Sequence, residues 1–120
     1  MIEFRNLTKK PVSTGKMRKL YNKIFLPAGQ AGPRKFELSV VFAPPSLMKK
    51  LNIKYRGADK PANVLSFLIG KNQGEIFLNI NEKNLPYLFL HGALHLLGHG
   101  HKNNKDAEKM EKLEKKILNR

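Results

Sequence analysis

The spacing of apolar side chains predicts strands alternating with helices in the first half of the chain. Residues 2–7 alternate apolar and polar positions as a strand does, and residues 16–26 carry apolar residues at helical spacing. Proline and glycine at 27–33 end that helix. Residues 36–43 are β-branched and aromatic enough for a buried strand, and paired prolines open a short helix over 44–52.

The second half continues with two strands and two helices. Residues 63–67 and 74–80 predict strands joined by a hairpin-like turn. Residues 84–98 predict a mainly apolar helix of three to four turns. Alternating charges around apolar positions in 103–118 are typical of an amphipathic helix that covers the edge of a core.

The length and composition favour one soluble domain over residues 1–120. A chain of 120 residues with 41% hydrophobic residues fits a single α/β or α+β unit, and no apolar run approaches the roughly 20 residues of a membrane span. The absence of cysteine excludes disulfides, thiolate metal sites and a cysteine nucleophile. The N-terminal residues lack the apolar segment of a secretory signal, so we expect a cytoplasmic protein without a membrane partner.

The charge is strongly positive and unevenly distributed. The formal net charge is +14, and residues 1–58 carry thirteen Lys and Arg against two Glu, whereas residues 59–120 carry ten against seven acids. A basic surface of this size attracts polyanions by releasing the counterions of their phosphates. A lysine-rich, merely solvated surface is the alternative, and nucleic acid is the leading partner.

All four histidines lie within the eleven residues "HGALHLLGHGH", residues 91–101. His91 and His95 are four apart, so a helix presents both imidazoles on one face. Gly98 and Gly100 provide a break that could return His101 to the same point. Three protein ligands leave an open tetrahedral position, as in catalytic zinc sites. The alternative is a set of core or surface imidazoles without a metal.

Zinc is the metal that imidazole ligands and tetrahedral geometry favour, although nickel, copper or iron can use the same nitrogens. Zinc proteases of the H-E-x-x-H type place a glutamate base one residue after the first histidine, where this chain has Gly92. The chain therefore lacks the base for ordinary peptide hydrolysis, whereas hydrolysis of a phosphodiester remains feasible. His99 is ambiguous, since a fourth ligand, a substrate contact or a loop residue would each fit it.

At these residues the chain resembles the YbeY endoribonucleases, also called rRNA maturation factors. The histidine stretch resembles that family's H-G-x-L-H-L-x-G-Y-D-H signature, and residues 51–67 and 73–79 resemble two further family segments. The terminal helix with Met110, Glu111 and Glu114 is similar too, so the match runs from about residue 36 to the end. Two departures stand out: His99-Gly100 replaces the family's Tyr-Asp, and the chain is short.

The resemblance implies a zincin-like α+β fold, with a small mixed sheet of about four strands packed with helices and a metal site on a central helix. It also implies a single-strand-specific, metal-dependent endoribonuclease that acts in ribosomal RNA processing and ribosome quality control. The expected partners are single-stranded ribosomal RNA and the ribosome or its proteins. The expected metal ligands are His91, His95 and His101, holding one Zn²⁺ or another divalent transition metal.

Four further positions carry expected roles. Arg56 matches a functional arginine of the family, and its guanidinium can hold a phosphate in two hydrogen bonds and neutralise charge in the transition state. Arg56, His91 and His95 are thus the expected catalytic residues, and Asn63 and Ser66 join Arg56 in binding substrate. Glu75, where the family usually has aspartate, either orients a ligand imidazole or caps a strand.

Two nucleophiles and two other functions stay open. Either an activated water or the RNA 2′-OH can attack the phosphodiester. A metalloprotease is favoured by the zincin-like arrangement and opposed by Gly92 and by the charge. A non-catalytic ribosome-binding factor with a structural metal is the other alternative.

Overall fold

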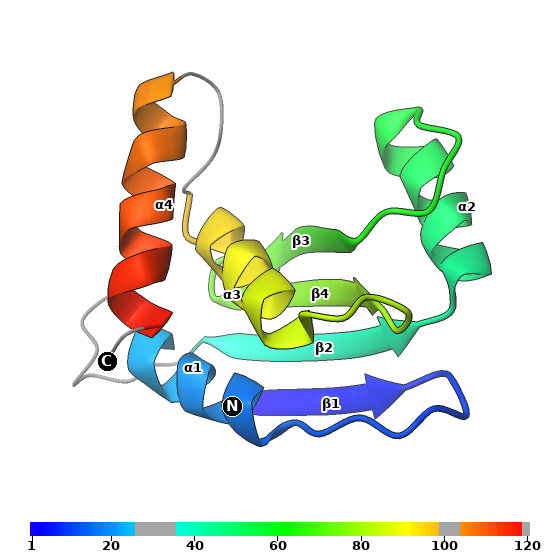
Figure 1. The fold of residues 1–120 in the computed structure, drawn as a ribbon, viewed down its shortest axis with the longest axis horizontal. Helices are drawn as coiled ribbons and strands as arrows, with labels where there is room; N and C mark the ends of the chain where they lie inside the picture. Colours follow the sequence, from blue (N-terminus) through cyan, green and yellow to red (C-terminus); the bar gives the residue numbers. More distant parts are fainter. Residues whose placement is uncertain (26–35, 99–103, 119–120) are drawn as a thin grey trace.

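The computed structural model describes residues 1–25, 36–98 and 104–118, and contains strands and helices in mixed order (Figure 1). The elements are β1 (Ile2–Asn6), α1 (Gly15–Phe25), β2 (Glu37–Ala43), α2 (Pro45–Arg56), β3 (Val64–Gly70), β4 (Gln73–Asn79), α3 (Leu85–Leu96) and α4 (Asn104–Leu118). Each segment with strand or helix spacing in the sequence forms the predicted kind of element.

The four strands form one mixed sheet in the order β1-β2-β4-β3. β1 runs parallel to β2 and β2 parallel to β4, whereas β3 is antiparallel to β4. The predicted hairpin is therefore confirmed, with a register irregularity between Leu68 and Gly70 next to its turn. The α+β class with a four-stranded mixed sheet is confirmed as well.

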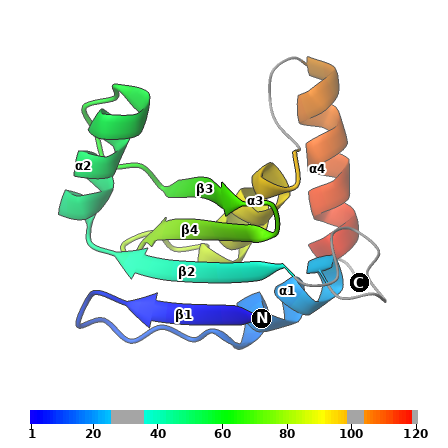
Figure 2. The same cartoon turned by 180° about the vertical axis from the view of Figure 1, so that it is seen from behind.

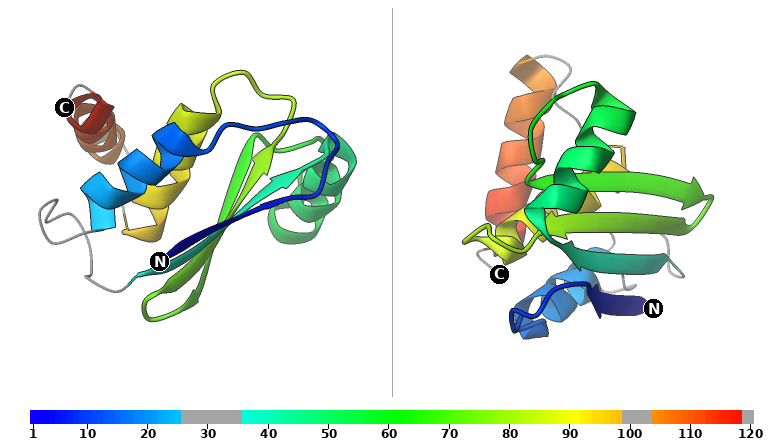
Figure 3. Two further views of the ribbon diagram at one scale, coloured as in Figure 1. Left: turned by 90° about the horizontal axis from the view of Figure 1, so that it is seen from below. Right: turned by 90° about the vertical axis from the view of Figure 1, so that its right-hand side faces the viewer.

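One face of the sheet is covered by α1 and α3, and α4 packs against these two helices on the side away from the strands (Figure 3). The main core lies between the strands and this layer of helices. Side chains on a strand alternate between its two faces, and every second residue of β2 and β4 points to this core. α3 is buried along most of its length against these strands. The residues that build this layer include Leu38, Val40, Phe42, Ile76, Leu78, Phe89, Leu90, Ala93 and Leu94.

The opposite face is covered at one end by α2, which packs a second, smaller core (Figure 2). Met48 of α2 is fully buried against Ala43 and Leu65 of the strands. The Asn52 amide donates to the Lys60 carbonyl at 2.8 Å and so ties the end of α2 to the loop before β3. These contacts fix the last turn of α2 beside β3, at the edge of the sheet.

Two element boundaries differ from the sequence prediction. α2 continues beyond residue 52 to Arg56 and ends at Gly57, which has the left-handed φ of 68° that favours glycine. The hairpin strands extend into the segment predicted as a turn and leave two residues, 71 and 72, between them. Within the described ranges, no helix is long and apolar enough to cross a bilayer.

Candidate active site

The two described histidines meet on the exposed side of α3. His91 Nε2 lies 3.1 Å from His95 Nε2, and the two rings are roughly perpendicular with centroids 4.7 Å apart. Two nitrogens bound at 2.0–2.1 Å to one tetrahedral ion lie about 3.3 Å apart. The pair therefore fits two ligands of a shared metal ion.

A carboxylate from another helix fixes the orientation of His91. Glu114 of α4 is 4% exposed, and its Oε2 lies 2.9 Å from His91 Nδ1. A neutral imidazole that donates Nδ1–H to this carboxylate leaves its Nε2 lone pair facing His95. The contact thus favours the tautomer that a metal ligand needs.

Tyr87 lies on the other side of the same carboxylate. Its hydroxyl donates to Glu114 Oε1 at 3.5 Å. Burial raises the pKa of the Tyr87 hydroxyl, and the neighbouring Glu114 charge raises it further. Tyr87 therefore stays a hydrogen-bond donor well into alkaline solution.

A cavity of about 560 Å³ opens in front of the histidines. It is lined by Arg56, Val64, Ser66, His91 and His95. Arg56 is exposed in the last turn of α2 and lines the cavity together with residues of β3 and α3. A permanently charged guanidinium and two imidazoles therefore line one space, which is the combination expected for binding and cleaving a phosphodiester.

Gly92 is glycine because α3 lies directly on β3 and β4 at this point. A Cβ at position 92 would approach Ser66 Oγ to 2.7 Å and the methyl groups of Val64 and Ile76 to 3.1 and 3.2 Å. The Ser66 hydroxyl donates to the Gly92 carbonyl at 3.0 Å and so holds the helix on the strand. Ser66 lines the cavity, but its hydroxyl is engaged with α3.

The other sequence-predicted residues lie elsewhere. Asn63 is exposed just before β3, next to the lining residue Val64 but not itself among the residues that line the cavity, and its carbonyl accepts the Asn79 N–H at 3.0 Å. Glu75 lies on the sheet face opposite α3, in a hollow with Glu3 and Glu37. It is Glu114 that contacts a predicted ligand imidazole, the role left open for Glu75.

The predicted third ligand, His101, and the ambiguous His99 lie outside the described residues. Among the residues that are described, no three His, Cys, Asp or Glu side chains gather as a set of metal ligands. The described part of the candidate metal site therefore consists of the His91–His95 pair and the carboxylate that contacts His91.

The comparison with known proteins decides the family. The family model described as Endoribonuclease YbeY matches residues 3–120. The chain belongs to the YbeY family. An endoribonuclease YbeY from Chelativorans sp. (strain BNC1) is 38% identical over 109 residues, which cover 72% of this chain and 67% of the relative. Another from Ehrlichia ruminantium (strain Gardel) is 33% identical, covering 100% of this chain and 90% of the relative.

A solved structure resembles this YbeY-family chain in fold. The solution structure of a Thermotoga maritima protein superposes with a TM-score of 0.58 at 24% sequence identity, covering 98% of this chain and 87% of that protein. This likeness supports the arrangement of sheet and helices in the YbeY-family chain.

Glu114 is the residue whose place in this YbeY site the sequence did not reveal. The sequence showed it only as part of a terminal helix similar to the family's. The available signal was its position on the apolar face of that helix, four residues after Met110 and three before Ile117, both of which are buried. A carboxylate at such a position needs a buried polar partner.

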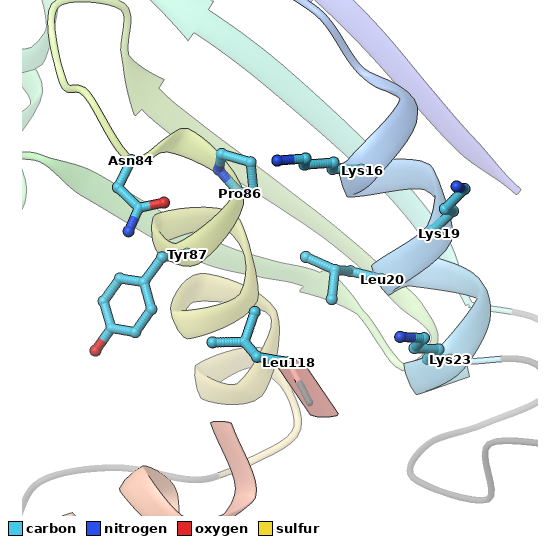
Figure 4. Close-up of a pocket in the computed structure, with 8 residues that line it drawn as sticks. All are labelled: Lys16, Lys19, Leu20, Lys23, Asn84, Pro86, Tyr87 and Leu118. Atoms are coloured by element: carbon cyan, nitrogen blue, oxygen red, sulfur yellow. The ribbon is translucent and has the colours of Figure 1, made fainter. Parts of the chain in front are cut away.

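A separate hollow of about 350 Å³ lies between α1 and α3 of the YbeY fold (Figure 4). Lys16, Lys19 and Lys23 line it from α1, and Pro86 and Tyr87 line it from the start of α3. The hollow is distinct from the histidine cavity and shows that the basic residues of the N-terminal half extend over α1.

Proposed function

We propose that this chain is a metal-dependent endoribonuclease that cleaves single-stranded RNA in ribosomal RNA processing. Membership of the YbeY family supports nuclease action on RNA and a place in rRNA processing. The observation that carries the assignment to a site is the cavity in which the Arg56 side chain faces the converging imidazoles of His91 and His95.

His91 and His95 would hold the metal ion, together with His101 as the family resemblance implies. A bound Zn²⁺, or another divalent transition metal, supplies a Lewis acid and lowers the pKa of water toward ~7. Glu114 keeps the His91 tautomer and ring orientation fixed through the 2.9 Å contact at Nδ1. Tyr87 holds the carboxylate in turn.

Arg56 would bind the phosphate that is to be cleaved. Its guanidinium can donate two parallel hydrogen bonds to a phosphodiester and stays charged at every physiological pH. It also neutralises the negative charge that grows on the phosphoryl oxygens in the transition state. The position of Arg56 at the end of a helix that packs on the sheet supports this role.

The decisive experiment joins metal analysis with cleavage of a single-stranded ribosomal RNA fragment. We expect metal in the purified protein, loss of cleavage in His95→Ala, and a roughly 10²- to 10³-fold lower rate in Arg56→Ala. Arg5→Ala is the matched control, since Arg5 is exposed on β1 at the other edge of the sheet. Undiminished cleavage by both His95→Ala and Arg56→Ala would overturn the site assignment.

A substrate variant separates the two possible nucleophiles. If the 2′-OH attacks, an RNA with a single 2′-deoxy residue at the cleaved linkage resists cleavage there. Equal cleavage of the ribose and 2′-deoxy linkages would show that water attacks.

Two other functions predict different experimental results. A protease would digest casein and lose this activity on His95→Ala, but Gly92 has no room for the carboxylate base of H-E-x-x-H enzymes. A non-catalytic ribosome-binding factor would lose thermal stability and RNA affinity together on His91→Ala. The nuclease proposal expects lost cleavage with RNA binding largely kept.

A further inference from the structure

An exposed aromatic ring lies next to the arginine of the cavity. Tyr55 immediately precedes Arg56 in the last turn of α2, and 55% of its surface is exposed. Its ring packs on Phe67 of β3, with centroids 4.9 Å apart, and Phe67 packs edge-on against Phe77 at 5.9 Å. The two phenylalanines therefore support the tyrosine ring from the sheet while much of it stays open to solvent.

The open surface of this ring is accessible to a charged partner. The Lys54 ammonium lies over the Tyr55 ring, 5.2 Å from its centroid. Because Lys54 is itself exposed, this contact is weak and exchangeable. A ligand with its own π-face can take the place of the lysine and leave the ammonium for a neighbouring phosphate.

The surroundings of Tyr55 are basic. α2 carries no acidic residue, and the acid that follows it, Asp59, pairs with Lys49 at 3.5 Å. The basic residues close to Tyr55 in the sequence are Lys49, Lys50, Lys54, Arg56 and Lys60. An exposed aromatic ring on a segment rich in basic residues is a combination by which proteins bind single-stranded nucleic acids.

Tyr55 and Arg56 lie near neighbouring side chains of the edge strand β3 that point to opposite faces of the sheet. Phe67, which supports Tyr55, belongs to the smaller core under α2, whereas its neighbour Ser66 lines the histidine cavity with Arg56. The Cα atoms of the two consecutive residues are about 3.8 Å apart. An RNA strand that passes over the edge of β3 can therefore meet Arg56 with a phosphate and the Tyr55 ring with the base of an adjoining nucleotide.

We propose that Tyr55, supported by Phe67, is a nucleobase-stacking site for the nucleotide next to the phosphate held by Arg56. The inference rests on the proposed function and names the part of the RNA that this surface recognises. A base paired in a helix is stacked between its neighbours, so Tyr55 binds only an unpaired base. Stacking tolerates any base, because each has a π-face.

Binding without cleavage tests the proposal. The full chain is titrated, in a chelator that stops metal-dependent cleavage, with a labelled single-stranded RNA and with the same strand made abasic. We expect Tyr55→Ala to weaken RNA binding roughly 5- to 150-fold, the effect of losing one stacked base, and to leave abasic-strand binding almost unchanged. Tyr55→Phe, which keeps the ring, should bind RNA like the wild type.

Ile53→Ala is the matched control, because Ile53 is 46% exposed on the same helix and has no ring. Thermal unfolding of each variant verifies the fold. Unchanged RNA affinity in Tyr55→Ala, or equal losses for RNA and abasic strand, overturns the stacking site. If wild type discriminates RNA from the abasic strand through Tyr55 but cuts no RNA, the stacking site stands and the nuclease proposal fails. If cleavage depends on His95 but RNA binding and cleavage do not depend on Tyr55, the nuclease proposal stands and the stacking site fails.

Discussion

Glu114 combines burial with a contact to a proposed metal ligand, and its neutral analogue tests that contact. Glu114→Gln keeps the size of the side chain but removes the charge that strengthens the hydrogen bond from His91 Nδ1. Loss of such an outer partner lowers metal affinity roughly 10- to 100-fold, and we expect this result in competition with a chromophoric chelator. Glu111→Gln, at an exposed residue paired with Lys115, should bind metal normally. Normal affinity in Glu114→Gln would show that the carboxylate does not support a ligand.

Gly92 sets the distance between α3 and the sheet, and adding one methyl group tests this. Gly92→Ala places a Cβ within 2.7 Å of Ser66 Oγ, so the helix or the serine must move. Alanine favours a helix, but overpacking costs about 1–3 kcal/mol, and we expect net destabilisation in urea unfolding. Gly15→Ala is the control, because nothing lies within 4 Å of a Cβ at that position. Equal stability of Gly92→Ala and wild type would show that the helix has room to shift.

The residues of the site differ in how far the sequence could predict them. His91 and His95 share a helical face, so their approach follows from local spacing. The motif resemblance singled out Arg56, which lines the cavity with them. The contact between His91 and Glu114 spans 23 residues and depends on how α4 packs on α3, so no local pattern contains it.

Among the elements, hydrophobic spacing located all eight and misplaced two boundaries. The last turn of α2 carries no buried residue, because Ile53 and Tyr55 are about half exposed, so burial did not mark it as helix. The predicted turn between β3 and β4 is too long, because Leu68 and Ile69 belong to β3. Both side chains are largely exposed, so this end of the strand does not contribute to the core. In both places the helix or strand continues through backbone hydrogen bonds beyond its last buried residue.

α4 is held by a few buried apolar residues, and truncating one of them should weaken both the fold and the site. Met110 is fully buried, and Met110→Ala should lower the free energy of unfolding by about 2–5 kcal/mol in urea unfolding. Metal affinity should fall with it, because α4 carries Glu114. Lys112→Ala, on the exposed side of α4, should change stability by less than about 0.5 kcal/mol. Full stability in Met110→Ala would mean that α4 contributes little to the core.

At the scale of the whole molecule, the net charge of +14 predicts RNA binding that depends steeply on salt. For single strands, the slope of log affinity against log salt is about −0.7 per neutralised phosphate, so four contacts give about −3. Arg56→Ala should make this slope shallower by about 0.7. Lys116→Ala, in the half of the chain with the smaller excess of positive charge, should leave the slope unchanged in the same titrations. A wild-type affinity independent of salt would contradict a phosphate-based interaction.

The close approach of Gly92 to the sheet also limits the paths by which this enzyme can evolve. A single substitution at residue 92 could supply the glutamate found in H-E-x-x-H proteases, next to histidines that are already in place. The resulting side chain would collide with Ser66 and with the methyl groups of Val64 and Ile76. A glutamate at this position would therefore need smaller residues on β3 and β4 as well. Several coordinated substitutions, and not one, therefore separate this fold from a protease of that type.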